Sequence, residues 1–124
     1  MLYAILCYDS EDVVCSWTKE EDDATMDRLK AVERDLAAEG RLGPVARLLP
    51  TTAATTLRKG REALVLDGPF AETKEQLLGF YVVDCATLDE ALDIARSLAG
   101  ANSLAVGSYE IRPIAYFNPG SGVT

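Results

Sequence analysis

Apolar runs alternate along the chain with amphipathic segments, and capping motifs and glycines mark the boundaries between them. The apolar run at residues 2–8 predicts a first strand that is buried on both faces. Residues 18–21 have the pattern of a capping box, and apolar side chains follow it at spacings of three and four residues. This pattern predicts an amphipathic helix over residues 19–39, which Gly40 would end.

Turn residues, capping motifs and apolar spacing also predict the elements of the rest of the chain. A turn at 59–61 lies between two β-prone segments, and a second capping box begins at Thr87. Residues 9–17 are expected to be irregular. The further elements predicted are strands at 45–49, 80–85 and 109–114, a hairpin with arms at 51–57 and 63–66, a helical turn at 73–78, and a helix at 88–98.

This order of elements predicts an α+β fold of the ferredoxin-like, split βαβ kind, with an inserted β-hairpin. Such a fold has an antiparallel sheet with two helices on one face. The other face needs cover, and a homodimer is the simplest way to supply it. We expect one domain over residues 1–117 and a flexible C-terminal tail over 118–124, which is rich in Gly, Pro and Ser.

The amino-acid composition argues against some classes of binding partner. The chain has 20 acidic and 12 basic residues, and its net charge of −8 argues against nucleic acids and anionic membranes as partners. No apolar run approaches the roughly 20 residues that a membrane span requires. The apolar N-terminus has no basic residue before it, so we read it as a strand and expect a cytoplasmic protein.

The chain contains three cysteines and no histidine. Without histidine, Ser-His-Asp and Cys-His catalysis and His-ligated metals are excluded, and no cysteine spacing indicates a metal site. We expect Cys7 and Cys85 to be reduced core residues and Cys15 to be more accessible.

The string DGPFAETKE at residues 67–75, followed by LGFY at 78–81, is long and unusual. With the closing segment 107–114, it resembles the DGPF-domain proteins, a branch of the YCII-related family, over residues 2–117. The resemblance implies a ferredoxin-like fold in the dimeric α/β-barrel superfamily, whose members include cofactor-free lyases, isomerases and monooxygenases. Some DGPF proteins occur beside, or fused to, extracytoplasmic-function sigma factors. Certain YCII-related relatives use a His and Asp pair, which this chain cannot reproduce.

The DGPF string supplies the first candidate site. Asp67 is either a turn residue bonded to nearby backbone or a catalytic carboxylate that faces a pocket. Gly68 and Pro69 are interpreted as structural turn residues. Phe70 is either a core plug or a pocket wall.

Charged and aromatic residues extend this list. Glu72 and Lys74 form either a solvated face or part of a cleft shared with Asp67, in which the lysine would bind an anionic ligand. Tyr81 would either donate to a ligand in the dimer cavity or pack at the interface. Arg112 would either pair with Glu110 on the same strand face or bind a substrate carboxylate. Tyr8 and Asp9 are weaker candidates to line the mouth of a cleft.

Two functions follow from these residues. The leading hypothesis is a homodimeric protein that binds a small molecule without a cofactor, with enzymatic activity left open. The alternative is a non-catalytic interaction or regulatory module linked to a sigma factor, which the acidic surface and the missing histidine favour.

Overall fold

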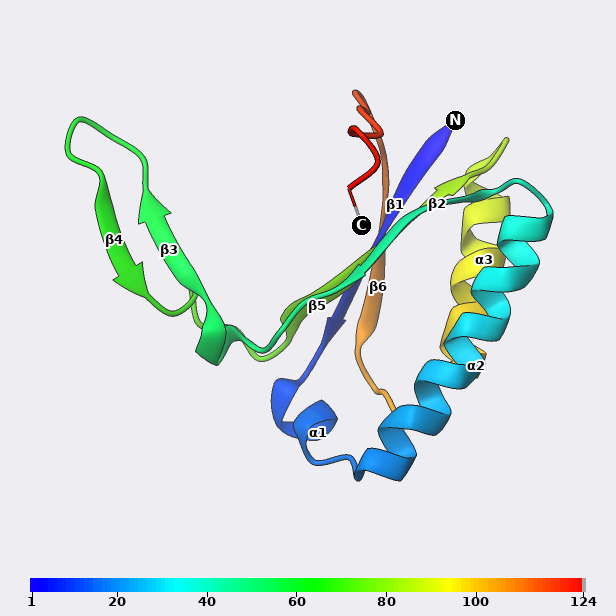
Figure 1. The fold of residues 1–124 in the computed structure, drawn as a ribbon, viewed down its shortest axis with the longest axis horizontal. Coiled ribbons are helices and arrows are strands. Elements are labelled where there is room, and N and C mark those ends of the chain that lie inside the picture. Colours follow the sequence, from blue (N-terminus) through cyan, green and yellow to red (C-terminus); the bar gives the residue numbers. More distant parts are fainter. Residues whose placement is uncertain (124) are drawn as a thin grey trace.

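The computed structural model describes residues 1–123 as a four-stranded antiparallel sheet with two long helices on one face (Figure 1). The strand order β2-β5-β1-β6 is that of the ferredoxin-like fold, as predicted. The elements in chain order are β1 (Leu2–Asp9), α1 (Glu11–Cys15), α2 (Lys19–Ala38), β2 (Leu42–Arg47), a 3₁₀ turn (Thr51–Ala53), β3 (Thr55–Arg58), β4 (Leu64–Asp67), β5 (Gln76–Asp84), α3 (Leu88–Ala101) and β6 (Ser108–Pro113).

Both long helices begin where the capping motifs predict. At α2 the Thr18 hydroxyl accepts from the Glu21 amide at 3.1 Å, and the Glu21 carboxylate accepts from the Thr18 amide at 2.9 Å. This closes the predicted capping box. At α3 the Thr87 hydroxyl accepts from the Glu90 amide, but the Glu90 carboxylate takes the amide of Ala86 instead. The second box is therefore only half formed.

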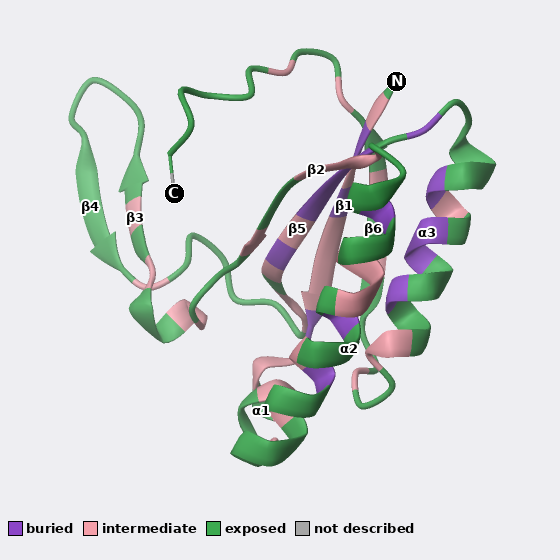
Figure 2. Ribbon diagram, turned by 45° about the vertical axis from the view of Figure 1, so that its right-hand side comes forward, coloured by how far each residue is buried: buried purple, intermediate pink, exposed green. Residues whose placement is uncertain are grey.

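The core lies between the sheet and the two helices (Figure 2). Ile5, at the centre of β1, is opposite Tyr81 on β5 and Ile111 on β6. Ile5 is fully buried, as is Leu98 on the inner face of α3. Since side chains alternate along a strand, the neighbouring residues Leu6 and Phe80 lie on the opposite face of the sheet, which no helix covers.

A hairpin arm, made of β3, β4 and their connection (residues 55–67), forms a separate two-stranded sheet that projects away from the main one (Figure 1). Its root is fixed by polar contacts. The Glu11 carboxylate accepts from the Thr51 hydroxyl at 2.7 Å, and the Glu11 amide donates to Gln76 Oε1 at 2.9 Å. Several large apolar side chains on and near the arm are exposed: Leu57, Leu64, Val65, Leu66 and Phe70.

Four local expectations were wrong. The first arm of the hairpin, expected from residue 51, begins only at Thr55, after the 3₁₀ turn Thr51–Ala53. The helical turn expected at 73–78 is not formed, because β5 already begins at Gln76 and pairs with β1 from there. Residues 11–15, expected to be irregular, form the short helix α1. Strand β2 begins before the Gly43-Pro44 breaker, where a side chain at position 43 would lie 3.0 Å from the Val82 carbonyl oxygen, so glycine allows the close approach.

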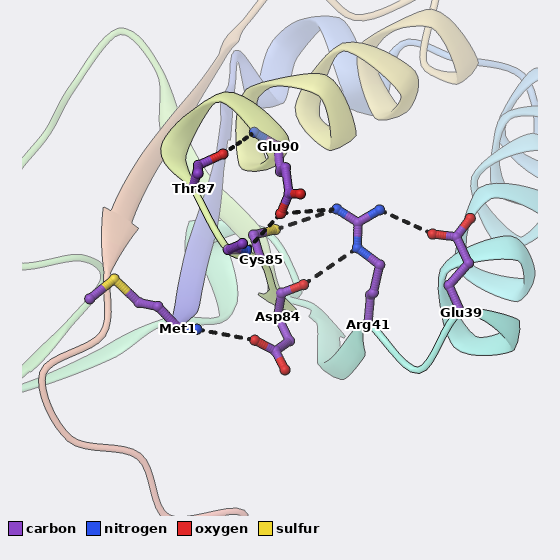
Figure 3. A network of polar contacts seen from close by, with 8 residues as sticks. Met1, Glu39, Arg41, Asp84, Cys85, Thr87 and Glu90 are labelled. Carbon is purple, nitrogen blue, oxygen red and sulfur yellow. Dashed lines mark hydrogen bonds and ion pairs between the residues drawn. The ribbon is translucent and has the colours of Figure 1, made fainter.

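An arginine joins the ends of three elements at the edge of the sheet (Figure 3). Arg41, just before β2, forms an ion pair with Glu39 at 3.0 Å and lies 4.0 Å from the Glu90 carboxylate of α3. Its Nε also donates to the Asp84 carbonyl oxygen at the end of β5. These contacts hold the two helices to the sheet at the end opposite the α1 segment.

The chain after Pro113 has no regular element up to residue 123. The tail predicted over 118–124 ends at Thr124, which lies outside the described residues. Among residues 1–123, no helix has both the length and the apolar character to cross a membrane.

Candidate functional site

A cavity of about 390 Å³ lies between the sheet and the first half of α2. Its size is within the roughly 300–1,000 Å³ of small-molecule sites. Much of its wall is apolar: Val14, Trp17, Met26, Leu29, Ala99 and Ala105. Its polar lining comes largely from the end of β1, the start of β6 and the loop between α3 and β6.

Asp9 closes β1 at one end of this cavity and is 7% exposed. One carboxylate oxygen accepts from the Ser10 amide at 2.8 Å. The burial of Asp9 depends on Gly107, which runs directly against the end of β1. A Cβ at that position would lie 2.7 Å from the Asp9 Cα and closer still to the Tyr8 carbonyl oxygen. The absence of a side chain at Gly107 therefore brings the start of β6 beside Asp9.

Tyr109 and Asn102 face the same end of the cavity. Burial raises the pKa of the Tyr109 hydroxyl; the Asn102 amide opposes this rise, and Cys7 and Asp9 add to it. Asn102 itself ends α3, where its backbone amide donates to Leu98 and Ala99. Its Oδ1 is buried and has no hydrogen-bond donor within residues 1–123.

Tyr81 and Cys7 complete the floor of the cavity on β5 and β1. Burial raises the pKa of the Cys7 thiol from 9.0 to about 12. Burial also raises the pKa of the Tyr81 hydroxyl, with further contributions from Cys7, Tyr109 and Glu33. The Cys7 thiol and the Tyr81 and Tyr109 hydroxyls are therefore neutral near pH 7, and the two hydroxyls are available as hydrogen-bond donors.

The basic groups of the lining are exposed. Lys30 on α2 is one of them. Arg47 at the end of β2 is the other, and it forms an ion pair with Asp22 at 2.8 Å. The lining therefore combines two carboxylates, Asp9 and Glu33, with tyrosine hydroxyls, and its two basic side chains are exposed to solvent.

The residues singled out in the sequence are not gathered in one place. Tyr81 lines the cavity, on the helix side of the sheet rather than on the open face where a dimer cavity would lie. Tyr8 and Asp9 line it as well. Within residues 1–123 the other predicted site residues do not line it: Asp67, Gly68, Pro69, Phe70, Glu72, Lys74 and Arg112.

The DGPF segment lies at the root of the hairpin arm, where β4 ends beside the start of β3. Asp67 is the last residue of β4 and is exposed, and Phe70 is 79% exposed, which excludes the core plug. Glu72 and Lys74 are exposed in the following loop. The Gly68 amide donates to the Ala54 carbonyl at 2.8 Å, and its φ of +92° is one that glycine adopts without strain.

Arg112 lies on the open face of β6, opposite Ala4 of β1. Among the described residues no ion pair joins it to Glu110, although both are exposed on the same face. Exposure explains the missing pair, because a solvated guanidinium has no need of a buried partner.

Three cavity residues were missed in the sequence. Trp17 was noted only as a large apolar residue in a polar segment, and Tyr109 only as one face of the last strand. Asn102 lies in a loop without any motif. Gly107 was the sequence signal that could have pointed to this site, because a glycine directly before a strand indicates that another part of the backbone passes close by.

Comparison with known proteins identifies the family. The model of the YCII-related domain matches residues 1–118. The chain belongs to the YCII-related family. An uncharacterized protein of Rhizobium meliloti (strain 1021) is 62% identical over 121 residues, which cover 97% of each chain. This YCII-related protein thus has a relative of nearly equal length that is itself uncharacterized.

Proposed function

We propose that this YCII-related protein binds a small molecule in the cavity between its sheet and α2. The observation that carries the proposal is the buried carboxylate of Asp9 in an otherwise largely apolar cavity, beside Asn102 and the two tyrosine hydroxyls. A buried carboxylate costs free energy unless it is compensated, so its position in a cavity favours a role in binding. No cofactor is part of this proposal.

The same geometry supports proton transfer as a second proposal. A carboxylate that lines a cavity can serve as a general base, and a neutral tyrosine hydroxyl can stabilise an oxyanion by donating to it. Asp9 and Tyr109 supply these two groups at one end of the cavity. This is the chemistry expected of a cofactor-free lyase or isomerase.

We further propose that the protein is a homodimer formed through the open face of the sheet. Leu6 and Phe80 are half-buried on this face, and no helix covers it (Figure 2). Pairing with a second copy would remove this apolar surface from water. Sedimentation analysis of wild type and of Phe80→Glu tests this, with a monomeric variant expected.

Trp17 provides a direct test of binding, because it is the single tryptophan of the chain and it lines the cavity. Its fluorescence should change on addition of a small ring compound that enters. Ala105→Leu, which fills part of the cavity, should weaken the response. The matched control Ala24→Leu adds the same side chain at an exposed position of α2 and should leave the response unchanged. A flat response to a broad panel refutes the proposal.

The alternative site at the DGPF segment is tested with the same panel by thermal shift, since a ligand stabilises the state that binds it. A stabilisation lost in Asp67→Asn or Arg112→Ala, and kept in Tyr109→Phe, would place the site outside the cavity. The exposed apolar side chains of the arm instead favour an interaction module, with a sigma factor as the proposed partner. Deletion of the arm with retained ligand binding would separate the two functions.

A further inference from the structure

Asp9 is the most deeply buried charged residue of the cavity lining. It is 7% exposed, and none of the ion pairs within residues 1–123 involves it. Its Oδ1 accepts from the Ser10 amide at 2.8 Å. Its Oδ2 has no donor in this part of the chain and, unlike Asn102 Oδ1, keeps surface that solvent can reach. A ligand in the cavity therefore has a free carboxylate oxygen to bind.

The two basic side chains of the lining do not neutralise Asp9. Lys30 is exposed on α2 and forms no ion pair within residues 1–123. Arg47 is exposed and paired with Asp22 at 2.8 Å, while Glu33 adds a second negative charge to the lining. A buried carboxylate without a cation costs free energy, which a cationic ligand beside it would recover. An anionic ligand is disfavoured at the same place, because like charges repel at short distance.

Aromatic rings are concentrated in the same lining. Trp17 is the single tryptophan of the chain, and Tyr8, Tyr81 and Tyr109 are three of its five tyrosines. The face of an aromatic ring attracts a cation by about 0.5–2 kcal/mol. These rings also offer apolar surface to the hydrocarbon part of a ligand. The lining is therefore suited to a molecule that has both a positive charge and an apolar body.

Strand register places one of these rings close to the carboxylate. Tyr109 on β6 is opposite Cys7 on β1, and Gly107, two residues before Tyr109, runs against the Cα of Asp9. Tyr109 is thus a diagonal neighbour of Asp9, and both residues line the cavity. The Cβ atoms of such neighbours are about 7 Å apart, so one small ligand can contact both side chains.

We infer that the ligand is a small organic cation, an amine whose ammonium group pairs with Asp9 and whose apolar body lies against the aromatic wall. Alkyl and cycloalkyl amines are of this class, and carboxylates and phosphates are not. This inference rests on the proposed binding function and specifies its ligand class.

Three probes of one ring size test it: cyclohexylamine, which is protonated near pH 7, cyclohexanol and cyclohexanecarboxylate. Each is titrated against the intact protein by Trp17 fluorescence, and none of them absorbs where tryptophan is excited. The amine should bind about tenfold more tightly than the alcohol, as expected for a charge-assisted hydrogen bond, and the carboxylate should bind most weakly. An alcohol or carboxylate that binds as well as the amine overturns the inference but leaves the cavity as a binding site. Absence of binding by all three refutes the proposed function itself.

Two matched variants locate the effect. Asp9→Asn keeps the side-chain shape and an acceptor for the Ser10 amide, and it should reduce the preference for the amine to about twofold or less. Asp12→Asn removes the same charge from an exposed position of α1 outside the lining, and it should keep the full preference. A preference that survives Asp9→Asn, or that falls equally in both variants, overturns the inference. An equal fall would mean that the amine responds only to the overall charge of −8.

Melting temperatures separate a ligand-binding carboxylate from a structural one. Without ligand, Asp9→Asn should melt at the same temperature as the wild type or higher, because it removes an unpaired buried charge. The amine should raise the melting temperature of the wild type and of Asp12→Asn, but not that of Asp9→Asn. A clear loss of stability in ligand-free Asp9→Asn would mean that the folded chain already compensates the carboxylate, which contradicts the inference.

Discussion

Replacing Gly107 by alanine tests the contact on which the cavity depends. The new Cβ would lie 2.7 Å from the Asp9 Cα and closer to the Tyr8 carbonyl oxygen. Both are backbone atoms in β1, so they cannot turn aside as a flexible side chain does. Overpacking of this kind costs about 1–3 kcal/mol, from which the lower entropy of the unfolded alanine chain subtracts about 0.4–1 kcal/mol. We expect a net loss of about 1–2 kcal/mol in the free energy of unfolding.

Gly100→Ala is the matched control. Gly100 lies in the last turns of α3, and a Cβ there meets no atom of the described chain within 4 Å. Alanine is the better helix former by about 0.5–1 kcal/mol, so this variant should be more stable than the wild type. Urea unfolding of both variants should therefore move their midpoints in opposite directions. A Gly107→Ala protein as stable as Gly100→Ala would refute the close approach of β6 to Asp9.

Three further predictions concern stability and reactivity. The free energy of unfolding should fall as pH rises above 9, by about 1.4 kcal/mol per pH unit. The reason is that burial raises the pKa of the Cys7 thiol to about 12, so this thiol stays protonated in the folded protein after the unfolded thiol has ionised. In pH-dependent denaturation, Cys7→Ala should weaken this fall and Cys15→Ala should not. Leu98→Ala, at a fully buried position, should cost about 3–5 kcal/mol by urea unfolding, far more than Leu88→Ala, which truncates a half-exposed side chain. Thr18→Ala should cost about 1 kcal/mol in the same assay, because it opens the capping box of α2, and Thr18→Ser should keep most of that stability.

The fold was predictable where local sequence signals agree with tertiary packing. The capping box at Thr18 and the apolar spacing after it gave α2 to within one residue of its end. The strand around Tyr81 was also recognised, but its start was missed, because Gln76 is polar and pairs with β1 only through the backbone ladder. Backbone pairing of polar residues leaves no periodic pattern for sequence reasoning to find.

The site was less predictable for a different reason. The motif at residues 67–75 is recognisable as a string, but its place is set by contacts at the root of the hairpin arm, between β4 and β5. These contacts include partners far away in the sequence, because Glu11 binds both Thr51 before the arm and Gln76 after the motif. Asn102 is similar: its Oδ1 is buried although the residue is only half-buried, and an asparagine just after a helix is by itself typical of a turn.

The pleat of the sheet separates the two proposed surfaces of the molecule. On β1, Cys7 faces the cavity while Leu6 faces the open side, and on β5 the same relation holds between Tyr81 and Phe80. Ligand and second copy would therefore contact opposite faces of the same two strands, through residues adjacent in sequence. Because each face is supplied by every second residue, a substitution at Phe80 changes the open face without entering the cavity. Ligand binding and dimer formation can thus be measured apart, and a loss of both in Phe80→Glu would mean that the second copy supports the cavity.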